Sequence, residues 1–301
     1  MPDRIPYLDE APNVREALSR ASVLFTDLDG TLFAPGGLLL GDASGAPSVA
    51  TAEAVVAINR AGLAAVVTTG RNRLQCMELS RVLGWRAFIA ELGTVVVHDL
   101  TEPPTYFLGD WPQGALLPGE TPYEAIIRSG ALEELRRHFP GRIEEHTPWH
   151  LDREATHVLR GNIDLTRARA ALDALGLPVT LIDNGIVRAP QNSLVDVTEV
   201  HAYHLVPKGV TKSRAIEEVL AHRSLLREDA LAIGDSATDV AMADAVALGV
   251  MVRNALDDDR VLAEAARRDN VVATRKERGE GWAECAHAWL AARRSRSLVR
   301  R

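Results

Sequence analysis

The chain has few cysteines, few aromatic residues and no excess of positive charge. Its two cysteines, Cys76 and Cys285, lie far apart among 301 residues, and we expect unpaired thiols in a reducing compartment. Aromatic residues make up only 5 %. The formal net charge of −7 argues against a general nucleic-acid binder, because such proteins usually carry a basic face. The basic residues at 293–301 are therefore expected to form a solvated tail.

Long apolar runs are also missing. No segment approaches the ~18 apolar residues of a membrane-spanning helix, and the first twenty residues are too polar for a secretory signal. These absences predict a cytoplasmic protein without a membrane partner, and leave monomer and homodimer open. Hydrophobic residues still make up 47 %, much of it Ala, Val and Leu, which suits an α/β protein with buried parallel strands.

Strand and helix patterns alternate at both ends of the chain. In the first part we expect strands at 22–27, 63–71 and 87–99 and helices at 14–20, 49–62 and 72–84. This order implies a parallel sheet with right-handed crossovers. After about residue 200 we expect helices at 211–224, 238–249, 256–268 and 281–293, and strands at 230–236, 250–252 and 271–274.

The middle of the chain has a different pattern. Five prolines between residues 100 and 122 indicate a loop. Beyond it, we expect a helix at 123–138, a strand at 156–163, a helix at 165–176, and strands over 179–190 around a turn at Asn184–Gly185. The chain is therefore expected to have a discontinuous core, residues 1–95 plus 197–301, interrupted by an α+β domain of residues 96–196.

Polar residues follow the predicted parallel strands of the core. Asp27 and Asp29 follow the first strand, Thr69 follows the second, and Asp235 and Asp239 follow the strand at 230–236. Ligands of parallel α/β sheets bind beyond the carboxyl ends of the strands. Several carboxylates gathered there repel one another unless a cation is present, and oxygen ligands suit a hard ion such as Mg²⁺. The sequence therefore predicts a Mg²⁺ site.

Four motifs in order carry a resemblance to a known family. FTDLDGTLF (25–33), VVTTGR (66–71), KGVTKSRAI (208–216) and IGDSATDVAMADAV (233–246) resemble the four motifs of haloacid dehalogenase superfamily phosphatases. The α+β insert resembles the type-two cap of the Cof-like branch, which includes sugar-phosphate, sucrose-phosphate and mannosyl-3-phosphoglycerate phosphatases. The resemblance implies a Rossmann-like parallel sheet core with an inserted α+β cap domain that sets substrate specificity.

The resemblance also implies roles for individual residues. Asp27 is the expected nucleophile, and Asp29 is the expected general acid and base. Lys212 is expected to neutralise the phosphoryl charge; it is preferred to Lys208 because it is the second lysine of its motif and begins the following helix. The expected phosphate contacts are Leu28, Thr69, Gly70, Lys212 and Thr238. The expected Mg²⁺ ligands are Asp27, Asp29 through its backbone carbonyl, and Asp235, with Thr31 and Asp239 behind them.

The sequence departs from the family pattern at a few positions. Thr238 and Leu92 stand where relatives often have Asn, and Ser213 replaces a common glycine. In the cap, the candidates for leaving-group contacts are Arg160, Asn162, Asn184 and Arg188, although each is more often an ordinary surface residue. A zinc site made by His146, His150 and His157 is disfavoured, because the proline in HTPWH (146–150) prevents a helix from presenting two of them on one face.

Together these features predict a Mg²⁺-dependent phosphomonoester hydrolase that uses an aspartyl-phosphate intermediate. Its partner is expected to be a small phosphorylated metabolite, of the sugar-phosphate kind. Two alternatives stay open: a phosphosugar mutase, which returns the phosphoryl group to its substrate, and a binding or regulatory protein on the same scaffold.

Overall fold

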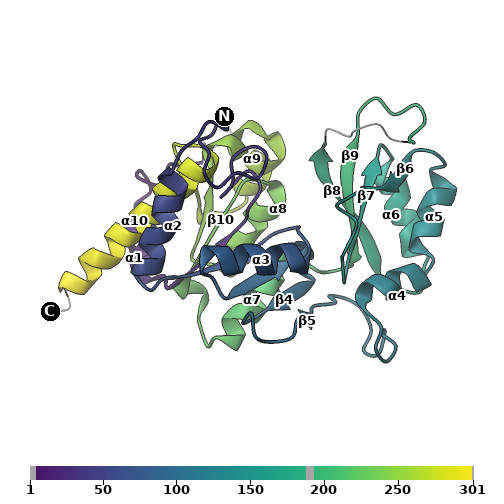
Figure 1. Ribbon diagram of the computed structural model, residues 1–301, viewed down its shortest axis with the longest axis horizontal. Helices are drawn as coiled ribbons and strands as arrows, with labels where there is room; N and C mark the ends of the chain where they lie inside the picture. The colour runs from purple at the N-terminus through teal and green to yellow at the C-terminus, as the bar shows by residue number, and fades with distance from the viewer. Residues whose placement is uncertain (1–4, 188–192, 300–301) are drawn as a thin grey trace.

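The computed structural model describes residues 5–187 and 193–299. Two sheets, each covered by helices, lie side by side (Figure 1). We call the smaller sheet together with helices α4–α6, residues 122–207, the cap. Within the described chain, no helix has the length and apolar character needed to cross a membrane.

The large sheet has the order β12-β11-β10-β1-β2-β3-β4-β5. Its strands are β1 (Val23–Thr26), β2 (Ala64–Thr68), β3 (Ala87–Ala90), β4 (Val95–Val97), β5 (Thr105–Tyr106), β10 (Ala230–Gly234), β11 (Leu248–Met251) and β12 (Val271–Ala273). Strands β12 to β3 run parallel, whereas β4 and β5 are antiparallel to their neighbours. The expected parallel α/β core is therefore present, with an antiparallel extension at one edge.

Helices cover both faces of this sheet. They are α1 (Val14–Arg20), α2 (Ala50–Arg60), α3 (Arg73–Leu83), α7 (Lys212–His222), α8 (Ala237–Val240), α9 (Asp259–Ala265) and α10 (Arg278–Val299). Short 3-10 turns lie at η1 (Glu91–Gly93), η2 (Arg227–Asp229), η3 (Ala241–Ala245) and η4 (Arg253–Asp257). Leu24 of β1 packs in a cluster with α1, α2 and α10, while Phe25 packs on the other face with α7. Every residue of β1 is buried because both faces are covered.

The cap is built around an antiparallel sheet of order β6-β7-β9-β8. Its elements are α4 (Pro122–Arg128), α5 (Ala131–His138), β6 (Ile143–Glu145), β7 (His157–Gly161), α6 (Leu165–Asp173), β8 (Val179–Ile186) and β9 (His201–Pro207). The helices cover one face, where Leu159 and Leu205 join their core. Figure 1 shows the other face turned toward the large sheet.

Several expected elements need correction. The helix expected at 123–138 is two helices, because Gly130 adopts φ +78° between them. No turn forms at Asn184–Gly185: β8 runs through this pair with an irregular register between Asp183 and Ile186. The segment expected to form one helix at 238–249 instead forms a single helical turn, α8, followed by η3 and β11. The last helix, α10, extends to Val299, through most of the segment expected to be a solvated tail.

The two sheets also do not change over at the expected domain boundaries. β4 begins at Val95 and β5 lies after it, yet both belong to the large sheet, and β9 lies after residue 196 yet belongs to the cap sheet. The division into domains at 95 and 197 stays a prediction, and these strands favour boundaries about ten residues further along the chain. Cys76 and Cys285 are free and buried, as expected for unpaired thiols.

Candidate active site

The loop after β1 brings two aspartates to the edge of the large sheet that faces the cap. The backbone N–H of Asp27 donates to the carbonyl of Ile233 at 3.0 Å, which keeps Asp27 in register with the end of β10. The chain then turns at Gly30, which has φ +81°. A Cβ at Gly30 would collide with the carboxylate of Asp235, so both the conformation and the close approach require glycine here.

Lys212 joins two of the buried carboxylates. It is the first residue of α7, and its Nζ lies 2.8 Å from Asp27 Oδ1 and 2.6 Å from Asp239 Oδ1. All three side chains are buried. Lys208 instead pairs with Asp173 at 2.6 Å on the surface, with its side chain 47 % exposed. The structure thus places Lys212, rather than Lys208, among the strand-end carboxylates.

Asp27, Asp235 and Asp239 form a compact acidic cluster. One carboxylate oxygen from each residue lies within 4.8 Å of those from the other two, and this is the one group of metal-ligating type found among residues 5–187 and 193–299. Thr31 Oγ1 donates to Asp235 Oδ1 at 3.1 Å. Asp239 Oδ2 accepts from the backbone N–H of Asp235 and of Ser236. Since both oxygens of Asp239 are engaged, Asp27 and Asp235 are the carboxylates with free acceptor capacity.

The charges of this cluster do not balance. Burial raises the pKa of Asp27 well above its usual value, although the nearby Lys212 ammonium opposes the shift. Burial, together with the charge of Asp239, raises the pKa of Asp235 to about 7. Burial alone would lower the pKa of Lys212, but the carboxylates of Asp239 and Asp27 hold it above its usual value. Two buried carboxylates and the half-buried Asp235 against one ammonium fit a divalent cation, whose charge would offset their repulsion.

The side chain of Asp29 lies apart from this cluster. Arg71 holds it with two hydrogen bonds, Nε to Oδ2 at 2.7 Å and Nη2 to Oδ1 at 2.5 Å. The Asp29 side chain is 57 % exposed, and it lines the same cavity as Asp27. Arg71 is thus engaged in a salt bridge with Asp29.

The remaining predicted phosphate contacts differ in their positions. Thr69, Gly70 and Thr238 line the cavity around Asp27 and Lys212. Thr69 is almost fully buried, and its N–H donates to the carbonyl of Ile89 at 2.9 Å. The side chain of Leu28 is completely buried in the core, so only the backbone of Leu28 could meet a phosphoryl group.

The cavity lies between the large sheet and the cap and has a volume of about 470 Å³. From the cap it is lined by His146, Trp149, Arg153, Val158, Asn184, Val187, Ala202 and His204. Of the cap residues suggested by the sequence, Asn184 lines the cavity. Arg160 instead pairs with Glu144, and Asn162 donates to the carbonyl of Glu199. Arg188 lies outside the described residues.

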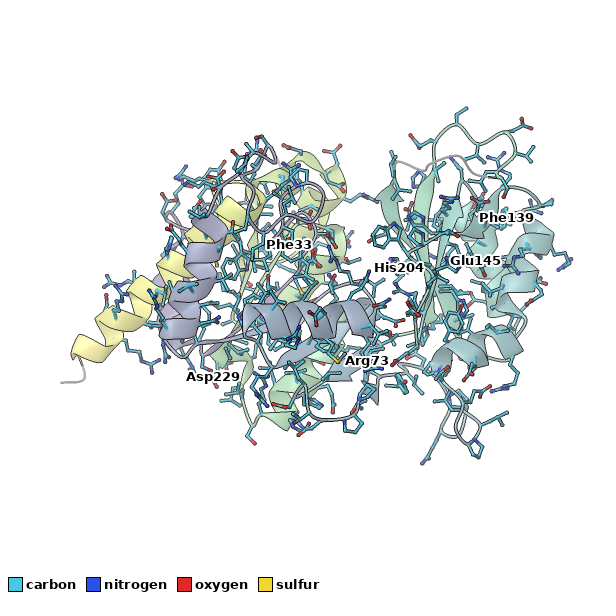
Figure 2. The ribbon with its side chains drawn as sticks, in the orientation of Figure 1. Phe33, Arg73, Phe139, Glu145, His204 and Asp229 are labelled. Atoms are coloured by element: carbon cyan, nitrogen blue, oxygen red, sulfur yellow. The ribbon has the colours of Figure 1, made fainter. Side chains whose placement is uncertain are left out.

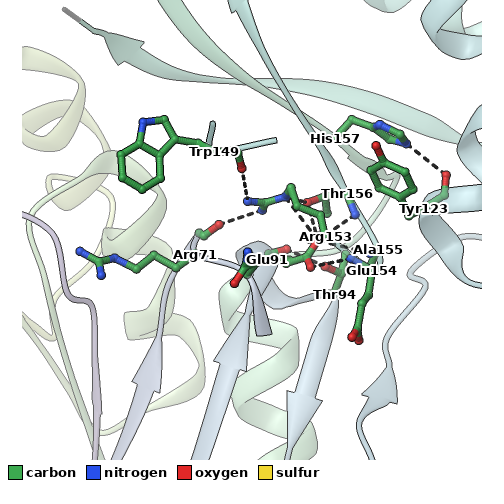
Figure 3. A network of polar contacts seen from close by, with 12 residues as sticks. Arg71, Glu91, Thr94, Tyr123, Trp149, Arg153, Glu154, Ala155, Thr156 and His157 are labelled. Atoms are coloured by element: carbon green, nitrogen blue, oxygen red, sulfur yellow. Dashed lines mark hydrogen bonds and ion pairs between the residues drawn. The ribbon is translucent and has the colours of Figure 1, made fainter. Parts of the chain in front are cut away.

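A buried network that the sequence did not indicate connects the cap to the large sheet (Figure 3). The carboxylate of Glu91, in η1 after β3, is fully buried and accepts hydrogen bonds from the N–H groups of Glu154, Ala155 and Thr156. Arg153 lies 3.5 Å from Glu91, and its Nη2 donates to the carbonyl of Gly70 at 2.8 Å. Through Arg153 and Gly70, the cap therefore contacts the loop that carries Thr69 directly.

Comparisons with known proteins agree with this fold. A family model for haloacid dehalogenase-like hydrolases matches residues 188–279. The chain is 28 % identical over 235 residues to a phosphoglycolate phosphatase of Methanoculleus marisnigri, covering 77 % of this chain and 84 % of that protein. It is 26 % identical over 247 residues to a phosphoglycolate phosphatase of Methanopyrus kandleri, covering 81 % and 89 %.

Among solved structures, the sucrose-phosphatase of Synechocystis in complex with sucrose and phosphate has a similar fold. It aligns with a TM-score of 0.59 at 16 % identity, covering 90 % of this chain and 98 % of that one. Fold, motifs and relatives agree on one class: the chain is a phosphatase that acts on phosphorylated substrates. Over residues 188–279 it matches the haloacid dehalogenase-like hydrolases, and its fold is similar to that of the Synechocystis sucrose-phosphatase.

Proposed function

We propose that the chain is a Mg²⁺-dependent phosphomonoester hydrolase that forms an aspartyl-phosphate on Asp27 and acts on a small sugar phosphate. One observation carries this proposal. A buried carboxylate, Asp27, is paired with the Lys212 ammonium at 2.8 Å and lies within 4.8 Å of Asp235 and Asp239, at the wall of a cavity of about 470 Å³.

The first half of the reaction transfers the phosphoryl group to the protein. An oxygen of Asp27 attacks phosphorus, and the bond from phosphorus to the leaving-group oxygen breaks. Asp29 donates a proton to that oxygen, so that the leaving group departs as a neutral alcohol. Lys212, between Asp27 and Asp239, offsets the negative charge that gathers on the phosphoryl oxygens. Thr69 and Gly70 add a hydroxyl and a backbone N–H from the loop after β2.

The second half hydrolyses the aspartyl-phosphate. The Asp29 carboxylate takes a proton from a water molecule, and the water oxygen attacks phosphorus to release inorganic phosphate and restore Asp27. Asp29 must leave Arg71 to act in this way, and its 57 % exposed side chain has room to rotate. The pairing with Arg71 therefore describes the resting arrangement of Asp29.

Asp27 and Asp235, with the backbone carbonyl of Asp29, are the groups that would hold Mg²⁺. Bound there, the ion would supply positive charge to the phosphoryl oxygens. Asp239 keeps Lys212 and the backbone of Asp235 and Ser236 in place behind these ligands, and Thr31 orients the Asp235 carboxylate.

Two substrate classes are favoured by different observations. The curated relatives are named as phosphoglycolate phosphatases, which favours a two-carbon leaving group. The cavity of about 470 Å³ has the size of sites for larger metabolites and leaves much of its volume empty around a two-carbon group. We therefore place sugar phosphates first and phosphoglycolate second.

The test is release of inorganic phosphate from acetyl phosphate and p-nitrophenyl phosphate, with Mg²⁺ and after removal of Mg²⁺ by EDTA. The proposal expects Mg²⁺-dependent release by the wild type and none by Asp27→Asn, which keeps the shape of the side chain. A mutase would instead isomerise hexose phosphates in the presence of a bisphosphate primer. Ligand-dependent melting with no turnover would indicate a binding protein and would refute the proposed hydrolysis.

A further inference from the structure

The face of the cap sheet that looks toward Asp27 carries two buried histidines. Side chains alternate along β9: Tyr203 and Leu205 join the core under the cap helices, while Ala202 and His204 line the cavity. In Figure 2, His204 lies on the side of the cap that faces the large sheet. His146 follows β6 and lines the same cavity.

Both imidazole rings are buried without a hydrogen-bond partner for one nitrogen. His204 is 5 % exposed and His146 is 8 % exposed. In the described part of the chain, Nδ1 of each ring is shut off from solvent and has no partner. A buried N–H without an acceptor is costly, so the proton of a neutral ring belongs on Nε2. Nε2 is then a donor available to a ligand in the cavity.

The ring of His204 lies against the predicted phosphate-binding loop. A Cβ placed on Gly70 would come within 3.3 Å of His204 Cε1 and 3.6 Å of Nε2. The Nε2 donor therefore sits beside the residues expected to hold the phosphoryl group, in the cap wall of the cavity. This position suits a contact to the first oxygens of the leaving group beyond the phosphate ester.

The cap face offers hydrogen bonds but little net charge. Arg153 is matched by Glu91 and Arg160 by Glu144. Burial and the charges of Arg153 and Lys212 lower the pKa of His204 well below its usual value. Burial and the charge of Arg160 lower the pKa of His146 as well. Both rings are therefore neutral near pH 7, and a carboxylate placed against them would find both of these cap arginines already paired.

The mouth of the cavity adds an aromatic surface. Trp149 lines the cavity with 55 % of its surface exposed. Figure 3 shows its ring pointing away from Glu91 and Arg153, while its backbone carbonyl accepts from Arg153 Nη1 at 3.4 Å. The face of an indole ring carries negative charge density, which accepts the C–H groups of a sugar ring but repels a carboxylate.

We propose that His146 and His204 are specificity-determining residues that donate hydrogen bonds from Nε2 to hydroxyl oxygens of an uncharged, polyhydroxylated leaving group. This inference rests on the proposed hydrolase function and names the part of the cap that selects the substrate. It excludes phosphoglycolate as the preferred substrate, because the leaving group of phosphoglycolate carries a carboxylate.

The experiment compares His204→Phe and His146→Phe with wild type on hexose, pentose and glycerol phosphates, on 2-phosphoglycolate and on acetyl phosphate. The readout is the kcat/KM of the best hydroxylated ester divided by that for acetyl phosphate, whose leaving group has no hydroxyl. We expect each variant to lower this ratio about tenfold, since a donor lost from a site built for a hydroxyl leaves the substrate oxygen unpaired. His204→Gln, whose amide nitrogen can replace Nε2, should restore part of the ratio.

The matched control is His157→Phe. His157 is a buried histidine of the same sheet, but it lies on the opposite face, stacked on Tyr123 with ring centroids 3.8 Å apart. We expect this control to keep the ratio within twofold of wild type. Circular dichroism and thermal melting verify that each variant is folded, and His146→Phe, near the edge strand, tests the inference independently if His204→Phe does not fold.

Two results would overturn the inference. One is a wild-type preference for 2-phosphoglycolate over every hydroxylated ester. The other is an unchanged ratio in both histidine variants. In either case, hydrolysis of acetyl phosphate by the wild type would leave the proposed hydrolase function intact, whereas a wild type that releases no phosphate from any of these esters would refute both proposals.

Discussion

Replacement of Glu91 by alanine is predicted to cost more stability than removal of any surface carboxylate. Glu91 Oε1 accepts from the N–H of Glu154 at 2.9 Å, and Oε2 accepts from the N–H of Ala155 at 3.2 Å and of Thr156 at 2.9 Å. The hydroxyl of Thr156 donates to the same Oε2 at 2.7 Å. Glu91→Ala would leave all four donors without an acceptor and Arg153 without its counter-ion.

The magnitude follows from the burial of both charges. The side chains of Glu91 and Arg153 are 0 % and 3 % exposed. Removal of one partner from a buried pair typically costs about 3–5 kcal/mol, because it leaves an uncompensated charge in the interior. We therefore expect the free energy of unfolding to fall by about 4 kcal/mol. In the double variant Glu91→Ala/Arg153→Met, which removes both charges, part of this loss should be recovered.

The assay is urea unfolding at 25 °C, followed by circular dichroism. The matched control is Glu78→Ala on α3, whose exposed carboxylate pairs with Arg81 and whose loss should leave the unfolding midpoint unchanged. If the free energy of unfolding of Glu91→Ala lay within about 1 kcal/mol of the wild-type value, the reasoning would be refuted, because the cap would then not depend on this carboxylate.

Other predictions concern the catalytic residues and the effect of pH. Asp29→Ala should abolish most turnover while Mg²⁺ binding survives in part, as measured by steady-state kinetics and calorimetry; unchanged rates would refute its acid–base role. Lys212→Ala should abolish phosphate release, whereas Lys208→Ala, on the surface, should leave kcat and KM unchanged. Burial lowers the pKa of His157 to about 4, so the unfolded chain binds the proton more readily. Stability should therefore fall as pH is lowered from 7 to 4, by up to about 3 kcal/mol, and His157→Phe should flatten this dependence.

The core of the fold could be predicted from local patterns. Strands such as β1 are continuous apolar runs followed at once by polar residues, and the helices between them carry apolar residues at helical spacing. The order of strands then follows from the right-handed crossover rule. The position of Asp27 near Asp235 could be predicted in the same way, since both follow neighbouring parallel strands and their carboxylate oxygens lie within 4.8 Å.

The cap was harder to predict because its strands are set by pairing over long distances. β9 begins with His, Ala, Tyr and His, which is not a clear apolar pattern, yet it is an inner strand of the cap sheet, between β7 and β8. The pair Asn184–Gly185 favours a tight turn in isolation. In the structure β8 pairs with β9 on both sides of these two residues, and the register shifts between Asp183 and Ile186.

The attachment of the cap had no signal in the sequence. Glu91 bonds to backbone N–H groups 63 to 65 positions further along the chain, and any residue type can supply a backbone N–H. The donors at His146 and His204 were hidden for a similar reason, because only the fold shows that both rings share one cavity.

The most direct measurement of the central claim is chemical trapping of the phosphoryl group. The enzyme is mixed with Mg²⁺ and acetyl phosphate and then treated with borohydride, which reduces an acyl phosphate on an aspartate to homoserine, and the peptides are analysed by mass spectrometry. We predict homoserine at position 27 only when Mg²⁺ and the phosphoryl donor are both present. Phosphate release without modification of Asp27, or modification of a different carboxylate, would contradict the account.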